Sequence, residues 1–197
     1  MVESLLQADE KAFLWLNGWV GRLPWLDGFV QWVDSDYLVP VALSLVLLGL
    51  WFTGSTRKAR ERNQWAVMTA ILGLALANLS VEILNHYLFR PRPFVDLPVS
   101  LLFYRPVDSS FPANPAVVGF AVATGVWCWN RKVGGVLFIV ATVFALSRVY
   151  AGVFYPLDII GGAALGAIVA LLTKRLLQWL DPLPSKIIQM ARTLYLA

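Results

Sequence analysis

The polar residues best suited to chemistry in this sequence lie in three short segments, two of which carry arginines. The segments cover 85–93 (Asn-His-Tyr-Leu-Phe-Arg-Pro-Arg-Pro), 109–116 (Ser-Ser-Phe-Pro-Ala-Asn-Pro-Ala) and 147–158 (Ser-Arg-Val-Tyr-Ala-Gly-Val-Phe-Tyr-Pro-Leu-Asp). Guanidinium groups bind phosphate oxygens through paired hydrogen bonds, and several at one site repel one another unless an anion lies among them. The arginines of these segments therefore indicate a phosphate-bearing ligand: Arg90, Arg92 and Arg148. The alternative is neutralisation within the protein by Asp96, Asp108 and Asp158.

A second set of polar residues follows one face of a predicted helix. Asn78, Glu82 and then Asn85 or His86 are spaced by three or four residues, which places them on the same side. An ionisable group inside a membrane span is costly, so we expect Glu82 to face the bundle interior with His86 as its partner. The pattern is typical of a proton or ligand site, or of a hydrogen bond that packs two helices.

Metal chemistry is not expected. The sequence has a single cysteine, Cys128, a single histidine, and no cluster of carboxylates. Cys128 lies in an apolar run and reads as a small buried side chain, so no disulfide and no cofactor is predicted.

The composition shows which kind of scaffold must position these residues. Of 197 residues, 58% are hydrophobic and 14% are charged, and the mean hydropathy is +0.66. A soluble domain is about 45–50% apolar and about 25% charged. The chain therefore reads as an integral membrane protein, which excludes a soluble enzyme, a disordered region and a disulfide-rich secreted scaffold.

Five apolar stretches predict membrane-spanning helices in an all-α, polytopic bundle. They cover 37–52, 65–84, 115–129, 133–149 and 159–172. In the last stretch, small residues such as Gly161, Gly162 and Gly166 permit close helix approach.

The charges predict the orientation of these helices. The links and tail on one side hold ten basic and two acidic residues, and an excess of Lys and Arg marks the cytoplasmic side. The three polar segments then fall on the extracytoplasmic face, in what we expect to be a bacterial cytoplasmic (inner) membrane. The net charge of +4 thus reflects the orientation of the helices in the membrane, and no nucleic-acid partner is expected.

Residues 1–36 and 182–197 flank this bundle in a single domain, 1–197. The first region interleaves aromatic residues with acids, so it predicts an interfacial amphipathic helix rather than a signal peptide, with a sixth span as the alternative. Pro182 and Pro184 end the last span, and an amphipathic tail follows.

The order of the motifs matches a known family. Arg92 and Pro93, Pro112, Ser147 and Arg148, and Asp158 fall at the spacing of a pattern that reads Lys, six residues, Arg-Pro; then Pro-Ser-Gly-His; then Ser-Arg, five residues, His, three residues, Asp. Over almost its whole length the chain resembles the membrane-embedded type 2 phosphatidic acid phosphatase superfamily, which shares its site with vanadium haloperoxidases. The resemblance implies a helical bundle around a phosphate site.

The resemblance also implies where the family's reactive groups would stand. In that family, the third-motif histidine attacks phosphorus and the second-motif histidine protonates the leaving oxygen. The matching positions are Phe154 and Pro115. A phenyl ring has no lone pair to attack with, and proline has no ionisable group. Asn85 stands at the Lys position, and Ala113 and Asn114 replace Ser-Gly.

The phosphate-binding candidates are therefore Arg92, Arg148, Arg90 and Asn85. The supporting residues are Asp158, Ser147, Asn114, His86 and Glu82. We expect Asp158 to be a salt-bridge partner beside Arg148 and Arg92.

Three functions follow from this pattern. The first is a catalytically silent member that binds a lipid phosphate, such as a phospholipid or polyprenyl phosphate head group, or serves as an accessory subunit of a membrane protein complex. The alternative is an active lipid phosphate or polyprenyl diphosphate phosphatase with a rearranged site that depends on His86. The third is a flippase or carrier for a phosphorylated lipid.

Overall fold

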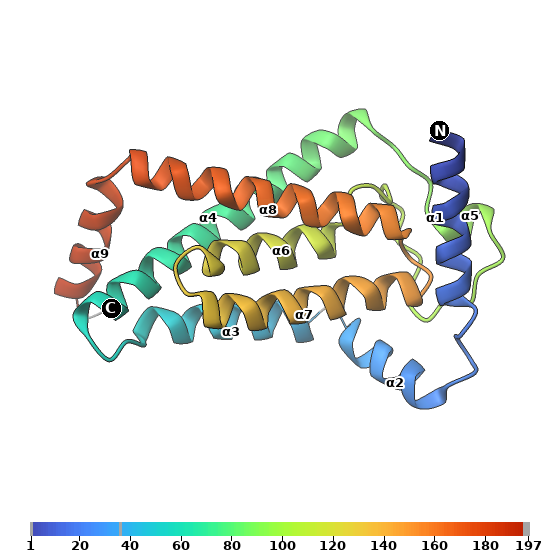
Figure 1. The fold of residues 1–197 in the computed structure, drawn as a ribbon, viewed down its shortest axis with the longest axis horizontal. Coiled ribbons are helices and arrows are strands. Elements are labelled where there is room, and N and C mark those ends of the chain that lie inside the picture. The colour runs from blue at the N-terminus through green and yellow to red at the C-terminus, as the bar shows by residue number, and fades with distance from the viewer. Residues whose placement is uncertain (1, 36, 195–197) are drawn as a thin grey trace.

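The computed structural model describes residues 2–35 and 37–194, and these residues form helices and connecting loops with no strand (Figure 1). The predicted N-terminal region includes residues 1 and 36, and the predicted tail includes 195–197, which lie outside the described residues. The helices are α1 (Val2–Asn17), α2 (Pro24–Val33), α3 (Leu38–Phe52), α4 (Arg57–Tyr87), α5 (Pro93–Asp96), α6 (Asn114–Trp127), α7 (Arg131–Tyr150), α8 (Pro156–Trp179) and α9 (Leu183–Thr193).

Local sequence explains where several of these helices begin. The Thr56 side chain accepts a hydrogen bond from the Ala59 N–H at 3.2 Å, which caps α4, and Asn130 caps α7 by accepting from the Val133 N–H at 3.3 Å. Proline lies in the first turn of α2, α5, α6, α8 and α9. A backbone N–H in the first turn has no partner within the helix, so the missing N–H of proline costs no helical hydrogen bond there.

Helix α6 runs through the middle of the bundle, and α4, α7 and α8 pack around it (Figure 1). The predicted close approach at the small residues of α8 is confirmed. A Cβ added to Gly162 would lie 2.5 Å from the Ala113 carbonyl oxygen, and one added to Gly166 would lie 2.4 Å from that of Val117. Only glycine fits there, because the α6 backbone occupies the space.

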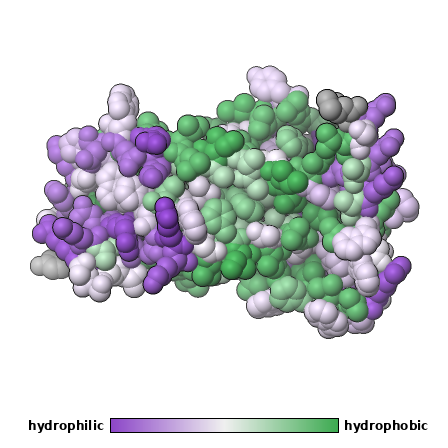
Figure 2. Space-filling model, viewed as in Figure 1, coloured by the Kyte–Doolittle hydropathy of each residue, from purple (hydrophilic) through white to green (hydrophobic). Residues whose placement is uncertain are grey.

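The length and hydropathy of its helices identify the chain as an integral membrane protein. Helices α4, α7 and α8 are each long and apolar enough to cross a membrane, and α2 with α3 passes the same test as a bent pair. Figure 2 shows apolar side chains over the middle of the molecule and hydrophilic ones at both ends. Each of the five predicted stretches overlaps one helix, and 37–52 and 115–129 extend one or two residues beyond theirs. Helix α6 is a shorter apolar helix, so three or four candidate spans are found in the described residues instead of five.

The two ends of the bundle differ in what they carry. One end, called here the site end, holds α1, α2, α5 and the long connection 88–113 (Figure 1). The opposite end, called the basic end, holds the α3–α4 turn, the α6–α7 turn and α9, with the ten basic residues counted above.

The N-terminal region packs onto protein at the site end. The Phe13 side chain is fully buried in the cluster formed by the end of α7 and the loop after it. The Asn17 amide donates to the carbonyl oxygens of Ser100 at 2.8 Å and Tyr150 at 2.9 Å, and the Tyr150 hydroxyl donates to Asp27 at 2.6 Å. These contacts tie the region to α7, and its interfacial position in the membrane stays a prediction.

Candidate functional site

The three polar segments come together around a cavity of about 230 Å³ at the site end, called here the arginine pocket. Arg92 and Arg148 line it from separate segments, and Asp108 and Asn114 add a carboxylate and an amide. Its other lining residues are mostly apolar, and they are Pro40, Phe103, Tyr104, Pro106, Pro115, Val118, Phe144, Val153 and Phe154. The pocket thus combines two guanidinium groups with a largely apolar wall.

The Arg92 guanidinium is buried and held from several sides. It donates from Nε to the Asp108 carbonyl oxygen at 3.0 Å, from Nη2 to Asp108 Oδ1 at 3.0 Å, and from Nη1 to the Val153 carbonyl oxygen at 3.2 Å. Its central carbon lies 4.3 Å from the centre of the Phe154 ring. Burial lowers the pKa of Arg92, while the Asp108 carboxylate opposes that shift.

Arg148, in the last turn of α7, is held by the end of α2. Its Nη2 donates to the Asp34 carbonyl oxygen at 3.0 Å, and its Nε lies 3.5 Å from Asp34 Oδ1. Asp34 Oδ1 also accepts a hydrogen bond from the Ser147 hydroxyl. The Phe103 ring lies 4.0 Å from the guanidinium carbon, so Arg148 has a fixed orientation.

Arg90 does not join the other two arginines, contrary to prediction. Its Nη1 lies 2.5 Å from Asp158 Oδ1 and its Nη2 lies 2.8 Å from Asp9 Oδ2, while its guanidinium stacks over the Tyr155 ring. Burial alone would lower the pKa of Arg90, but the hydrogen bond to Asp9 and the charge of Asp158 raise it above its ordinary value. Both carboxylates are fully buried, so Arg90 is used for internal charge balance.

The predicted pairing of Asp158 with Arg148 and Arg92 is therefore wrong. Asp158 also accepts from the Ser110 hydroxyl at 2.5 Å and from the Tyr155 N–H at 3.1 Å. It lies in the first turn of α8, and the loop that precedes this helix directs the carboxylate toward Arg90. Of the predicted internal carboxylates, Asp108 does pair with Arg92.

A second cavity of about 320 Å³ lies beside the arginine pocket and shares Asp108 and Asn114 with it. Glu82 and Asn85 line this second cavity. The expectation that Glu82 faces the bundle interior is wrong, because its side chain is exposed. Helix α4 continues only five residues beyond Glu82, so the carboxylate lies close enough to the end of the helix to stay solvated.

His86 is not brought into either cavity. It is exposed, and its ring stands edge-on to Tyr87 at 5.1 Å. The rotation of one residue along α4, about 100°, separates it from Asn85, which lines the second cavity. A rearranged catalytic site built on His86 therefore has no support from the geometry.

Three residues at the site were not singled out from the sequence: Asp9, Asp34 and Phe103. Asp9 and Asp34 lie in the N-terminal region, far along the chain from their arginines. The sequence carried one indication of Asp9 and Asp34, because residues 1–36 have an excess of acidic residues and lie on the side predicted to hold the arginines.

The comparisons with known proteins place this arrangement in a family. The model of the PAP2 superfamily matches residues 66–182, which is more than half of the chain. The chain belongs to the PAP2 superfamily. An undecaprenyl-diphosphatase of Bacillus subtilis, BcrC, is 31% identical over 157 residues, covering 80% of this chain and 78% of that protein. Phosphatidylglycerophosphatase B of the same species is 27% identical and covers 88% and 83%.

The fold is shared with solved members of this group. The crystal structure of Aquifex aeolicus LpxE has a TM-score of 0.65 and 29% identity, covering 84% of this chain and 93% of that one. The crystal structure of a transmembrane PAP2-type phosphatidylglycerolphosphate phosphatase from Bacillus subtilis also has a TM-score of 0.65, at 23% identity, covering 91% of this chain and 89% of that one.

The relatives bear on the functions predicted from the sequence. They are named as phosphatases and diphosphatases of membrane lipids, which favours the active phosphatase over the catalytically silent protein. They lend no support to an accessory subunit. The positions at which the resemblance places the two histidines, Phe154 and Pro115, both line the arginine pocket.

Proposed function

We propose that the arginine pocket binds the phosphate or diphosphate head group of a membrane lipid, with polyprenyl diphosphates as the leading class, and that this binding proceeds without hydrolysis. The observation that carries the proposal is that Arg92 and Arg148 line one cavity, each buried and held in a fixed orientation. Fixed guanidinium groups lose little entropy when they bind phosphate oxygens. The similarity to BcrC, an undecaprenyl-diphosphatase, supports the lipid class.

The side chains of the pocket support binding without the family's histidine chemistry. Phe154 packs beneath the Arg92 guanidinium and offers no lone pair, and Pro115 cannot protonate a leaving oxygen. The one histidine of the sequence, His86, lies on the exposed side of α4. Asp158 is fully buried against Arg90 and Ser110, so it is not placed to attack a lipid head group.

Hydrolysis is the second candidate, and the names of the relatives favour it. The carboxylate available for it is Asp108, whose side chain is 60% exposed beside Arg92. In such a reaction, an Asp108 oxygen attacks the terminal phosphorus and the bridging P–O bond breaks, releasing the lipid monophosphate. Water then cleaves the acyl phosphate to regenerate the carboxylate and release inorganic phosphate.

We place the arginine pocket on the extracytoplasmic side of the membrane. The basic end carries ten basic and two acidic residues, and such an excess of Lys and Arg is typical of cytoplasmic links. The head group would then reach the pocket from the outer leaflet. This is the side that the sequence predicts.

The test measures binding and phosphate release on the same purified full-length chain in lipid nanodiscs. Farnesyl diphosphate serves as a short-chain probe, with farnesol as the control that lacks phosphate. We expect saturable binding of the diphosphate and no release of inorganic phosphate above an empty-nanodisc blank. Arg92→Gln should abolish the binding. If the diphosphate binds no better than farnesol, the proposal is wrong.

Asp108→Ala separates the two candidates. If the pocket only binds, loss of this carboxylate removes a competitor for Arg92, and affinity should rise by up to about fivefold, the upper value for an ion pair whose carboxylate is exposed to solvent. If the wild-type chain releases phosphate and Asp108→Ala abolishes that release, hydrolysis replaces binding as the function. Asp96→Ala is the matched control, because Asp96 is exposed at the same end and lines neither cavity.

A further inference from the structure

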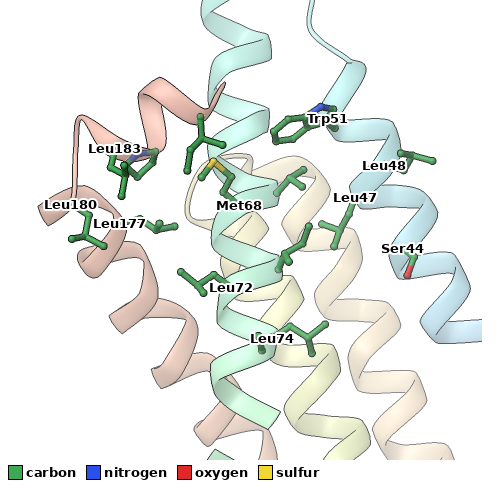
Figure 3. Close-up of a pocket in the computed structure, with 15 residues that line it drawn as sticks. Ser44, Leu47, Leu48, Trp51, Met68, Leu72, Leu74, Leu177, Leu180 and Leu183 are labelled. Carbon is green, nitrogen blue, oxygen red and sulfur yellow. The ribbon is translucent and has the colours of Figure 1, made fainter. Parts of the chain in front are cut away.

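A large cavity lies away from the arginine pocket, toward the basic end. It is an apolar groove of about 870 Å³ between α3, α4, α8 and α9. Figure 3 shows Trp51 on one side, Leu180 and Leu183 on the other, and Met68 and Leu72 between them. Ser44 supplies the only hydroxyl of the lining. The volume lies in the range of sites that bind small molecules, and the lining suits hydrocarbon.

Helices α4 and α9, which line the groove, also line a basic cavity. This second cavity, called here the basic cup, has a volume of about 310 Å³ and is lined by Gly54, Ser55, Thr56, Arg57, Arg60 and Arg192. Three of its six lining residues are arginines, and the lining holds no carboxylate. Gly54 of the cup comes three residues after Trp51 of the groove. On α4, Met68 of the groove comes eleven residues after Arg57, or about 16 Å along the helix axis.

Helix α9 forms a wall of both cavities. Leu183 and Ile187 line the groove, while Arg192, five residues after Ile187, lines the cup. Ile188 anchors the helix, because its side chain is buried against Trp65 and Leu177. The groove and the cup therefore keep a fixed position relative to each other.

Arg192 is held in place before any ligand arrives. Its Nη2 donates to Gln64 Oε1 at 2.7 Å, and its Nη1 lies 3.9 Å from Glu61. Glu61 is half-exposed and offsets part of one charge, while Arg57 and Arg60 are exposed. The cup therefore presents an excess of positive charge beside hydrocarbon-lined space.

From this juxtaposition we propose that the groove and the cup form a binding site for one anionic phospholipid of the leaflet at the basic end, with its phosphate in the cup and its acyl chains in the groove. Charge complementarity selects an anionic over a zwitterionic head group, since each basic residue near a membrane surface adds attraction for anionic lipid. The apolar groove selects a lipid over a free anion. The site is separate from the arginine pocket, so this proposal does not depend on the proposed function.

The experiment measures which lipid stays bound to the full-length chain. The protein is purified in mild detergent, incubated with equal amounts of phosphatidylglycerol and phosphatidylcholine, and analysed by native mass spectrometry. We expect one phosphatidylglycerol to be retained preferentially. Arg57→Ala and Arg60→Ala should each reduce this retention by about fivefold. Both residues are exposed, so the variants should fold, and an unchanged apparent Tm in lipid-free detergent checks this.

Two matched controls test the location of the lipid. Arg131→Ala with Lys132→Ala removes two charges at the same end but outside the cup, and should leave retention unchanged. Ala75→Trp should lower retention by filling the groove without changing charge, whereas Ile83→Trp, exposed on α4 outside the groove, should not.

Three results would overturn the proposal. The first is equal retention of the two lipids, which removes the charge selection. The second is an equal loss of retention in the Arg131 and Lys132 control, which indicates a diffuse surface effect. The third is displacement of the lipid by millimolar inorganic phosphate, which assigns the cup to free anions.

Discussion

Replacing Asp158 with alanine should destabilise the protein strongly, because this carboxylate joins three segments at the site end. It is fully buried and accepts hydrogen bonds from the Arg90 guanidinium at 2.5 Å, the Ser110 hydroxyl at 2.5 Å and the Tyr155 N–H at 3.1 Å. Removing one partner of a buried ion pair costs about 3–5 kcal/mol. For a chain of this size, about 2–4 °C of apparent Tm accompanies each kcal/mol, so a fall of about 6–20 °C is expected.

Thermal unfolding of the purified variants in one detergent measures this effect. Asp96→Ala is the control, since an exposed carboxylate should change stability by no more than about 0.5 kcal/mol. Arg90→Ala should be at least as harmful as Asp158→Ala, because it leaves both Asp9 and Asp158 buried without their cation. The double variant should lose less than the sum of the two single losses.

An Asp158→Ala variant that unfolds within about 2 °C of the wild type, a shift of no more than about 1 kcal/mol, would contradict this prediction. Asp158 would then not hold the segments together. A variant of wild-type stability that lost phosphate release would give the carboxylate a catalytic role.

Two further predictions test the assignment of the site and the packing of the bundle. His86→Ala should leave both diphosphate binding and any phosphate release unchanged, because the imidazole is exposed and lines neither cavity at the site end; loss of either signal in the binding and release assays would restore a histidine-dependent site. Gly166→Ala should lower stability by about 1–3 kcal/mol, seen as a lower apparent Tm, because its Cβ would lie 2.4 Å from the Val117 carbonyl oxygen. Gly49→Ala is its control, with nothing within 4 Å of the added Cβ, and an equal loss in both variants would contradict the packing argument.

Composition and helical periodicity predict the helical scaffold, because apolar runs of membrane length and small residues in the last run are visible in a sequence directly. That separate segments meet at one site was implied by the resemblance of the motifs at Arg92, Arg148 and Asp158 to a known family. Arg92 and Arg148 do line the arginine pocket, whereas Asp158 does not. The sequence predicts five spans, whereas the described residues contain three or four candidate spans, because α6 is short.

The tertiary structure alone decided the charge pairing. Arg90 and Arg92 are two residues apart, yet Arg90 turns to Asp9 and Asp158 while Arg92 turns to Asp108. Arg148 pairs with Asp34, which lies 114 residues earlier in the chain. Burial makes an unpaired charge costly, so each guanidinium takes the carboxylate that packing brings within reach, and sequence distance carries no information about that choice.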